Sequence, residues 1–216
     1  MRTMEVAHQR ASDLAYRQLK RDIETLRLSP GAVLNEAALM RELNVGRTPL
    51  REALQRLAMD RLVVIMPRQG TIVSDLSIQT LQEIFEVRVN LEGLSCRLAA
   101  ERGTPTQLEH LNTLLTTMKE VARASDYEAL LYLDQQFHRY IAGMSRNSHL
   151  EEILDRLNSQ SFRFWYLSFT RAGRLDETQA EHQTILEAMA TRDGARAQQY
   201  MLEHVEQFKR KVMANL

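Results

Sequence analysis

The stretch from residue 45 to residue 57 most constrains what this chain can fold into. Its apolar side chains recur at the spacing of one helix face, at Leu50, Leu54 and Leu57. Its polar and cationic side chains gather toward the start, at Arg47, Thr48, Arg51 and Gln55. A helix of this kind is built to reach base edges and phosphates with its first residues while its apolar stripe anchors it. An ordinary charged surface helix has the same pattern, so the flanking segments must distinguish a DNA-recognition helix from a surface helix.

The flanking segments favour DNA recognition. A helix predicted over residues 12–26 comes first, and a second over residues 35–43 leads through the turn at 44–46 into the cationic helix, which makes a helix-turn-helix. Two apolar runs, 62–66 and 71–73, then predict a β-hairpin whose tip carries Arg68 and Gly70. A hairpin in this place is a wing that contacts the DNA backbone or minor groove. Residues 1–75 are therefore predicted to form a winged helix-turn-helix domain that binds double-stranded DNA.

Charge and composition agree with this division. The chain has 28 basic and 28 acidic residues, but residues 1–74 carry a net charge of +4 and the remainder −4, as expected if the first part binds a polyanion. The only cysteine, Cys96, excludes a disulfide framework and a cysteine-based zinc site. No apolar run approaches the roughly 18 residues of a membrane helix, and the start lacks a signal peptide. We expect a cytoplasmic protein without a membrane segment.

Residues 76–216 are predicted to be all-α, so that the whole chain is mainly α. Caps, prolines and glycines divide this part into six helices that would form a bundle, over residues 78–102, 104–124, 126–145, 147–170, 175–191 and 194 to the end.

Four residues of the second domain have the spacing of a metal site. Asp134 and His138 are four apart and share a helix face. His182 lies 11 residues before Asp193 and His204 lies 11 after it, so antiparallel helices around that turn would bring the two imidazoles level. Three imidazoles and a carboxylate suit Zn²⁺, Ni²⁺ or Mn²⁺. A single histidine is more often a surface or core residue, but the combination favours a metal.

The N-terminal part resembles the DNA-binding domain of GntR-family bacterial transcription regulators. The resemblance runs from about Ala11 to Val73 and rests on Leu28-Ser29-Pro30-Gly31, Leu34-Asn35-Glu36, Arg47-Thr48-Pro49-Leu50-Arg51-Glu52-Ala53-Leu54 and Pro67-Arg68-Gln69-Gly70-Thr71. It implies that Arg47, Thr48, Arg51 and Gly70 contact an operator. Two residues depart from the family pattern: Gly46 replaces a helix-capping Ser or Thr, and Arg61 replaces a Gly before the hairpin.

The C-terminal part resembles the FCD ligand-binding domain, and its six helices resemble the VanR-type branch. The resemblance rests on Asp134-x-x-Phe137-His138, Ser145-Arg146-Asn147, Glu181-His182 and His204. It implies that Asp134 and the three histidines bind a metal, beside which a small carboxylate effector binds.

An anionic effector would need a cationic partner as well as the metal. Arg88, in Arg88-x-x-Leu91-Glu92, is the first candidate, although it could simply pair with Glu92, and Arg163 is the second. The aromatic run 162–166 could line the pocket or belong to the core or a dimer interface.

Together these features predict a regulator, not an enzyme. We expect a homodimer, because one recognition helix reads only a half-site, bound to an inverted-repeat operator and controlled by a small carboxylate at a Zn, Ni or Mn centre. One alternative is a direct metal sensor. Another is a metal-dependent hydrolase with a DNA-binding appendage.

Overall fold

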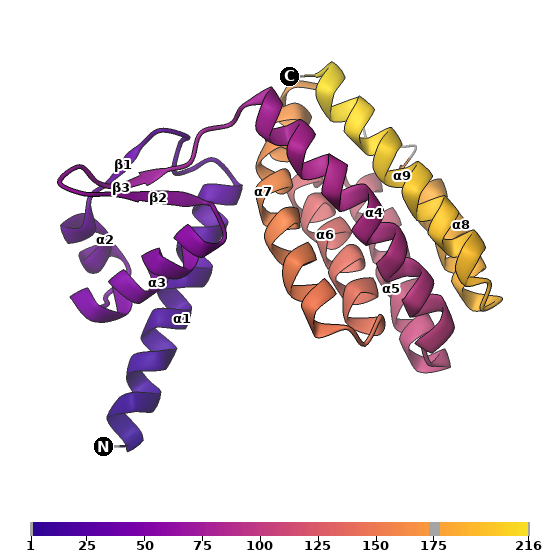
Figure 1. Ribbon diagram of the computed structural model, residues 1–216, viewed down its shortest axis with the longest axis horizontal. Helices are drawn as coiled ribbons and strands as arrows, with labels where there is room; N and C mark the ends of the chain where they lie inside the picture. Colours follow the sequence, from indigo (N-terminus) through magenta and orange to yellow (C-terminus); the bar gives the residue numbers. More distant parts are fainter. Residues whose placement is uncertain (1, 173–177, 216) are drawn as a thin grey trace. The chain divides into compact units, whose positions relative to one another are not determined.

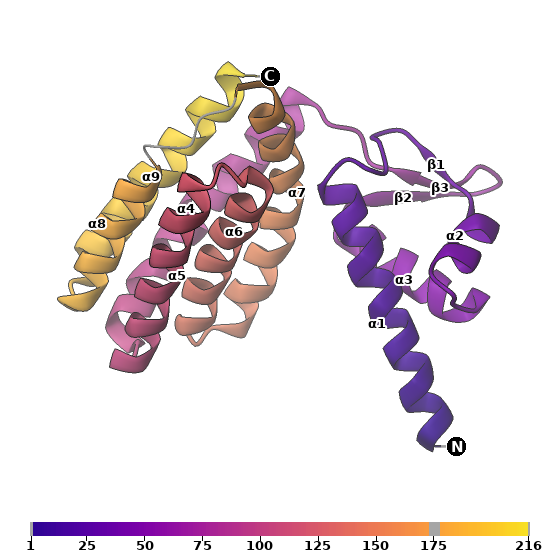
Figure 2. The ribbon, with the colours of Figure 1, turned by 180° about the vertical axis from the view of Figure 1, so that it is seen from behind.

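The computed structural model describes residues 2–172 and 178–215. It divides into two compact units, Met1–Ser77 and Ile78–Leu216 (Figures 1 and 2). The division falls two residues beyond the boundary expected from the sequence. None of the helices in the described ranges is long and apolar enough to cross a membrane.

The first unit contains three helices and a small sheet. Its elements are α1 (Arg2–Glu24), β1 (Val33–Leu34), α2 (Glu36–Glu42), α3 (Arg47–Met59), β2 (Val63–Met66) and β3 (Gly70–Val73). The strands are antiparallel in the order β1-β3-β2. Helix α1 begins earlier than the helix predicted over residues 12–26. Strand β1 was not predicted. A two-residue strand is too short to show a period, and it exists because Val33 pairs with Ile72 of the wing.

The apolar stripe of α3 forms the core of this unit, as predicted. Leu50, Leu54 and Leu57 are at most 2% exposed, and they pack in one cluster with Leu19 and Ile23 of α1. Burying a leucine or isoleucine side chain stabilises a fold by about 1.5–3 kcal/mol. The stripe therefore fixes which face of α3 remains available to solvent.

Local residues set the ends of α2 and α3. The Asn35 side chain accepts a hydrogen bond of 3.0 Å from the Ala38 N–H and is the N-cap of α2. Gly46 is the N-cap of α3 and provides no side-chain hydrogen bond. Asn44 turns the chain between the helices with a positive φ of 51°.

The wing is a β-hairpin in which Val63 pairs with Val73 and Met66 with Gly70. Arg68 and Gly70 at its tip have φ values of 66° and 91°. Arg61, which replaces the family glycine, also has a positive φ of 59°. The entry into the wing therefore keeps a glycine-like turn despite its side chain, at a local cost of about 1–2 kcal/mol.

The second unit is a helical bundle. Its helices are α4 (Ile78–Arg102), α5 (Pro105–Arg123), α6 (Tyr127–Met144), α7 (Ser148–Ala172), α8 (Thr178–Ala190) and α9 (Gly194–Ala214). All six expected helices are present within a few residues of the expected ends. The expected start of the fifth at Leu175, and the last residue of the chain, lie outside the described residues. Thr104, Asp126 and Asp193 cap α5, α6 and α9.

Helix α4 packs against α6, α7, α8 and α9 and lies at the front of the bundle in Figure 1. Two glycines permit its close approach to α9. A Cβ at Gly93 would lie 2.9 Å from Leu202 Cδ2, and one at Gly194 would lie 2.9 Å from Glu101 Oε1. Helices α8 and α9 flank the turn at Asp193 and lie side by side (Figures 1 and 2). This pairing positions the site described below.

Restoring the missing cap of α3 should stabilise the first unit. A Cβ at Gly46 would be 3.8 Å from Pro49 Cδ, so a side chain fits. Because a serine oxygen can accept an orphan N–H of the first turn, we expect Gly46→Ser to raise the free energy of unfolding by a few tenths of a kcal/mol. Gly46→Ala should instead lower it, so that serine and alanine differ by about 1 kcal/mol in urea unfolding. A serine variant no more stable than the alanine variant would contradict this.

Candidate metal centre and adjoining recess

The structure brings together the four residues predicted to bind a metal. Helix α6 supplies Asp134 and His138, α8 supplies His182 and α9 supplies His204, and each is at most 6% exposed. One possible ligand atom from each lies within 4.8 Å of the others. The antiparallel pairing of α8 and α9 around Asp193 brings the two later histidines level, as their spacing predicted.

The ligand atoms face one another at short range. His182 Nε2 is 3.1 Å and His138 Nε2 is 3.8 Å from the carboxylate of Asp134. His204 Nε2 is 3.3 Å from His138 Nε2. Despite its short distance, His182 Nε2 makes no hydrogen bond of acceptable geometry within the described part of the chain. The atoms thus point toward a shared position more than toward one another.

Two further carboxylates hold the outer nitrogens of the imidazoles. Glu92 Oε2 lies 3.2 Å from His138 Nδ1, and Glu181 Oε2 lies 2.7 Å from His204 Nδ1. A carboxylate here accepts the Nδ1 proton, which leaves the Nε2 lone pair directed into the cluster. Two such lone pairs 3.3 Å apart repel each other unless a positive charge lies between them.

The electrostatics also favour a cation. Burial raises the pKa of Glu92, but the opposing effect of His138 and Arg88 is larger and brings this pKa down to about 2. Burial likewise raises the pKa of Asp134, whereas the neighbouring histidines lower it to about 2. Burial and then His182 lower the pKa of His204 to about 4, which keeps it neutral near pH 7. Burial lowers the pKa of His138, but Glu92 and Asp134 raise it more, so this position attracts positive charge.

These residues fit a divalent metal ion. Bonds of about 2.0–2.1 Å place tetrahedral ligand atoms roughly 3.3 Å apart, and the separations of 3.1, 3.3 and 3.8 Å found here lie around that value. The donor set of three imidazoles and one ionised carboxylate is one that such ions accept. The two outer carboxylates give His138 and His204 the partners usual for metal-binding histidines, whereas His182 Nδ1 has no hydrogen-bond partner among the described residues.

A small recess of about 10 Å³, room for roughly one water molecule, adjoins the cluster. Helix α7 forms one wall with side chains one turn apart, and α4, α6 and α9 supply the rest; the lining residues are Arg88, Asp134, Gln135, His138, Asn158, Ser161, Phe162, Trp165 and Phe208. A second recess shares Arg88, Asp134, His138 and Phe208 and extends to His204 and Val205. An atom in this space would touch both Arg88 and candidate metal ligands.

Arg88 pairs with Glu92, which was one of the two interpretations made from the sequence, and its role toward an effector stays a prediction. It donates to Glu92 Oε1 at 3.3 Å and to Ser161 Oγ at 3.1 Å, and it also lines the recess. Arg163 is buried as well, but it is not among the residues that line either recess. From the aromatic run, Phe162 and Trp165 do line it.

Three features of the site were not predicted from the sequence: the role of Glu92, the role of Glu181 and the polar side chains of α7 that line the recess. The sequence indicates Glu92 only as a partner of Arg88, and Glu181 only as a neighbour of His182, because side chains at adjacent helix positions point apart. It does not predict the polar wall at Asn158 and Ser161. The signal available for this wall was the run Asn158-Ser159-Gln160-Ser161 in the middle of a helix otherwise rich in apolar residues.

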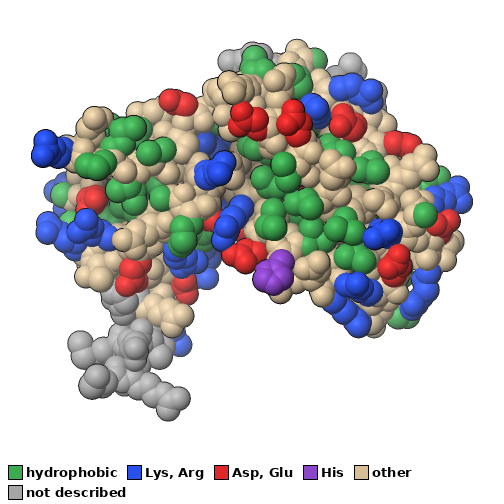
Figure 3. Space-filling model, in the orientation of Figure 1, with side chains coloured by type: hydrophobic (Ala, Val, Ile, Leu, Met, Phe, Trp, Pro, Cys, Tyr) green, Lys and Arg blue, Asp and Glu red, His purple; other side chains and the backbone are tan. Residues whose placement is uncertain are grey.

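The residues predicted to contact DNA all lie on exposed parts of the first unit. Arg47, Thr48, Arg51, Gln55, Arg68 and Gly70 are all exposed. The first four share the face of α3 opposite its buried stripe, and the last two lie at the wing. Lys and Arg side chains are visible along the edge of this unit in Figure 3.

Comparison with known proteins gives matches to both units. Residues 83–207 match the FCD domain, and residues 11–73 match bacterial regulatory proteins of the gntR family. The chain is 34% identical to the Nta operon transcriptional regulator of Aminobacter aminovorans over 82% of each chain. It is 26% identical to the HTH-type transcriptional repressor RspR of Escherichia coli over 91% of this chain and 86% of that one. The solved structure of E. coli McbR/YncC has the same fold, with a TM-score of 0.86 and 24% identity over 94% of this chain and 97% of that chain.

Removing one imidazole should disrupt metal binding. We expect His204→Ala to lower the affinity for Zn²⁺, measured by chelator competition, by more than the roughly 10–100-fold that loss of an outer hydrogen-bond partner costs. His149→Ala is the matched control, because His149 is exposed and lies outside the cluster. Equal affinity in the two variants would remove the site as drawn here.

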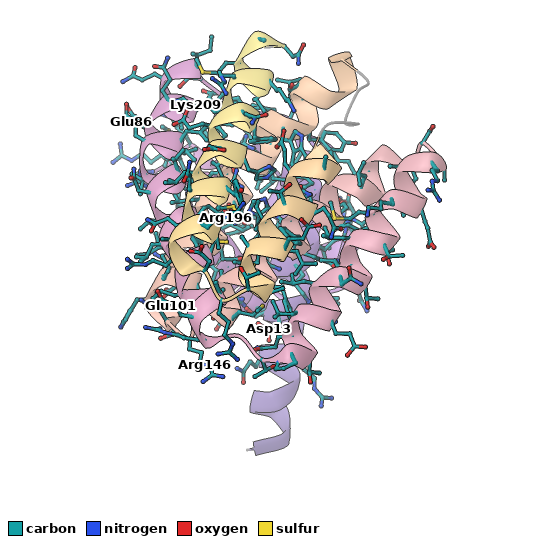
Figure 4. The ribbon with its side chains drawn as sticks, turned by 90° about the vertical axis from the view of Figure 1, so that its right-hand side faces the viewer. Asp13, Glu86, Glu101, Arg146, Arg196 and Lys209 are labelled. Carbon is teal, nitrogen blue, oxygen red and sulfur yellow. The ribbon has the colours of Figure 1, made fainter. Side chains whose placement is uncertain are left out.

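Removing an outer carboxylate should weaken metal binding less. Because Glu92 orients His138, we expect Glu92→Gln to lower Zn²⁺ affinity roughly 10–100-fold. Glu86→Gln is the control, since Glu86 is an exposed residue of the same helix (Figure 4). Glu92 would have no orienting role if both variants kept the affinity of the unaltered protein.

Proposed function

Because the chain belongs to the GntR family of bacterial regulatory proteins and carries an FCD domain, we propose that it is a transcription regulator whose operator binding responds to an effector at a metal centre. The observation that carries this proposal is the recess that touches Arg88, Asp134 and His138 together. A ligand atom there would contact a cation and a metal at the same time.

The first unit is proposed to bind the operator through α3 and the wing. Arg47, Thr48, Arg51 and Gln55 would reach base edges and phosphates in the major groove, while Arg68 and Gly70 would contact the backbone. The exposure of these residues, opposite a leucine stripe that anchors α3, supports the assignment.

Loss of either recognition arginine should weaken DNA binding. With an operator selected from random-sequence DNA, we expect Arg47→Ala and Arg51→Ala each to cost about 1–3 kcal/mol of binding free energy where the arginine contacts a base. An arginine that contacts only phosphate should reduce the salt dependence by about one charge. Arg196→Ala, an exposed substitution in the second unit (Figure 4), should leave binding unchanged. Unchanged affinity in both test variants would exclude α3 as the recognition helix.

A homodimer is proposed because one helix reads one half-site. Two copies related by a two-fold axis would place their recognition helices on the two halves of an inverted repeat. Native mass spectrometry of the purified protein tests this directly, since it reports dimer mass and bound metal in one spectrum. A monomer that binds a single half-site with full affinity would contradict it.

The resident ion is proposed to be Zn²⁺ or Ni²⁺, with Mn²⁺ as a further choice. Three imidazoles favour the first two, and the carboxylate is compatible with all three. The ion would be held by Asp134, His138, His182 and His204, and when bound it supplies a Lewis-acidic position that can accept an effector oxygen.

The effector is proposed to be a small carboxylate. Arg88 supplies the cationic partner beside the metal ligands, held in place by Glu92 and Ser161. The effector would change operator binding by binding with different affinity to DNA-competent and DNA-incompetent states of the protein.

Two observations weigh against the alternative functions. Both carboxylates near the cluster, Glu92 and Glu181, are engaged by imidazole Nδ1 atoms and by Arg88 or Lys211, so neither is placed as a general base for a hydrolase. The Arg88 guanidinium beside the cluster favours an organic effector over a direct metal sensor. Operator affinity measured with metal-free protein, metal-loaded protein and metal-loaded protein plus carboxylates separates these functions, because a direct sensor responds to the metal alone.

A further inference from the structure

We propose that Tyr16 is a positioning residue for DNA recognition. It ties the last turn of α3 to α1 and thereby fixes where along its own axis the recognition helix lies. This inference rests on the proposed function of the first unit, in which α3 reads the operator. It adds a residue that contacts no DNA itself and acts through Arg56 and Asp60.

The junction of α1 and α3 is closed at one end by polar side chains around Tyr16. The Tyr16 hydroxyl group donates a hydrogen bond of 2.6 Å to Asp60 Oδ2. The guanidinium carbon of Arg56 lies 4.0 Å from the centroid of the Tyr16 ring, within the range of a cation–π interaction. Arg56 also donates a hydrogen bond of 2.6 Å to Asp13 Oδ1 on α1. These four residues are called the clasp below.

The clasp holds the end of α3 that is not proposed to reach DNA. Arg56 belongs to the last turn of α3, and Asp60 is its C-cap. An α-helix rises about 1.5 Å per residue, so along the axis Arg51 lies roughly 8 Å and Arg47 roughly 14 Å from Arg56. Because the helix is continuous from Arg47 to the clasp, a shift of its last turn along the axis also moves both recognition arginines.

The apolar core does not by itself fix this axial position. Leu50, Leu54 and Leu57 are buried in one cluster with side chains of α1, but hydrophobic contact is non-directional. A hydrogen bond weakens steeply when its geometry departs from the preferred distance and angle. The clasp therefore adds a directional constraint that the leucine stripe lacks.

Within the clasp, the bond from Tyr16 carries most of this constraint. The side chains of Arg56 and Asp13 are 39% and 40% exposed, and exposed ion pairs contribute little. The bond from Tyr16 to Asp60 is partly buried, and its acceptor is a carboxylate, which makes a stronger hydrogen bond than a neutral acceptor does. Loss of the hydroxyl group alone should therefore loosen the end of α3.

The test separates operator recognition from general DNA binding. The full chain is titrated with an operator selected from random-sequence DNA and with the same DNA after its selected bases have been permuted. Tyr16→Phe keeps the ring and removes the hydroxyl group. We expect it to lower operator affinity roughly 3- to 30-fold, a part of the roughly 5- to 150-fold that one well-placed arginine–base contact provides. Affinity for the permuted DNA should not change, because non-specific binding depends on charge, which the variant keeps.

Ile23→Val is the matched control for stability. Ile23 is buried in the core between α1 and α3 and is not a member of the clasp. Loss of one buried methyl group destabilises the first unit but leaves the directional contacts in place. Urea unfolding ranks the stability of the two variants. The control should keep the ratio of operator affinity to permuted-DNA affinity that the unaltered protein has.

A second variant tests the route through Asp60. Asp60→Ala removes the acceptor of the Tyr16 hydrogen bond, so it should lower the affinity ratio as Tyr16→Phe does. The double variant should be no worse than either single variant, because both remove the same contact. Asp60→Asn should keep most of the ratio, since its amide oxygen can still accept the bond.

The outcomes separate this inference from the proposed function. An unchanged ratio in Tyr16→Phe, or an equal loss in Ile23→Val, would overturn the positioning role, while a loss in Arg51→Ala would keep α3 as the recognition helix. Additive losses in the double variant would overturn the bond to Asp60 as the route. If the unaltered protein does not distinguish the two DNAs, the proposed function of the first unit fails, and this inference fails with it.

Discussion

The bundle depends on one fully buried carboxylate. Glu92 has no exposed surface, and its two oxygens divide between Arg88 and His138. A buried charge is tolerable only when it is paired and hydrogen-bonded, so the positions of both partners are tied to it. Arg88 faces the recess and His138 faces the other imidazoles. The same carboxylate therefore connects the place where an anion would bind to the place where a metal would bind.

The fourth ligand, His204, reaches the same site because α4 can pack closely against α9. Gly93 follows Glu92 directly, and a side chain there would collide with Leu202. Because Gly93 has no side chain, α9 can lie close to α4. Helix α9 carries His204, and α4 carries the buried carboxylate. Glu181, on α8, contacts two residues of α9: its carboxylate lies 2.7 Å from His204 Nδ1, and it accepts a hydrogen bond from Lys211. The cluster is thus supported from outside by helices that contribute few of its ligand atoms.

The first unit shows how family departures are absorbed locally. Gly46 leaves the first turn of α3 without a side-chain cap, yet the leucine stripe holds the helix against α1. Arg61 adopts the left-handed backbone that a glycine would adopt, so the wing keeps its place. Core packing is worth more than either local loss, because each buried leucine stabilises the fold by about 1.5–3 kcal/mol.

The sequence alone was enough to predict the helices, the wing and the four members of the cluster, because periodicity, caps and the spacing of His182 and His204 about Asp193 are local or nearly local signals. It could not supply β1, which exists only through pairing with β3. Nor could it show that Glu181 supports His204, or that Asn158 and Gln135 line one recess while Arg163 does not. Those facts depend on how far each helix is rotated and how closely it approaches its neighbours, and that is decided by packing across the whole bundle.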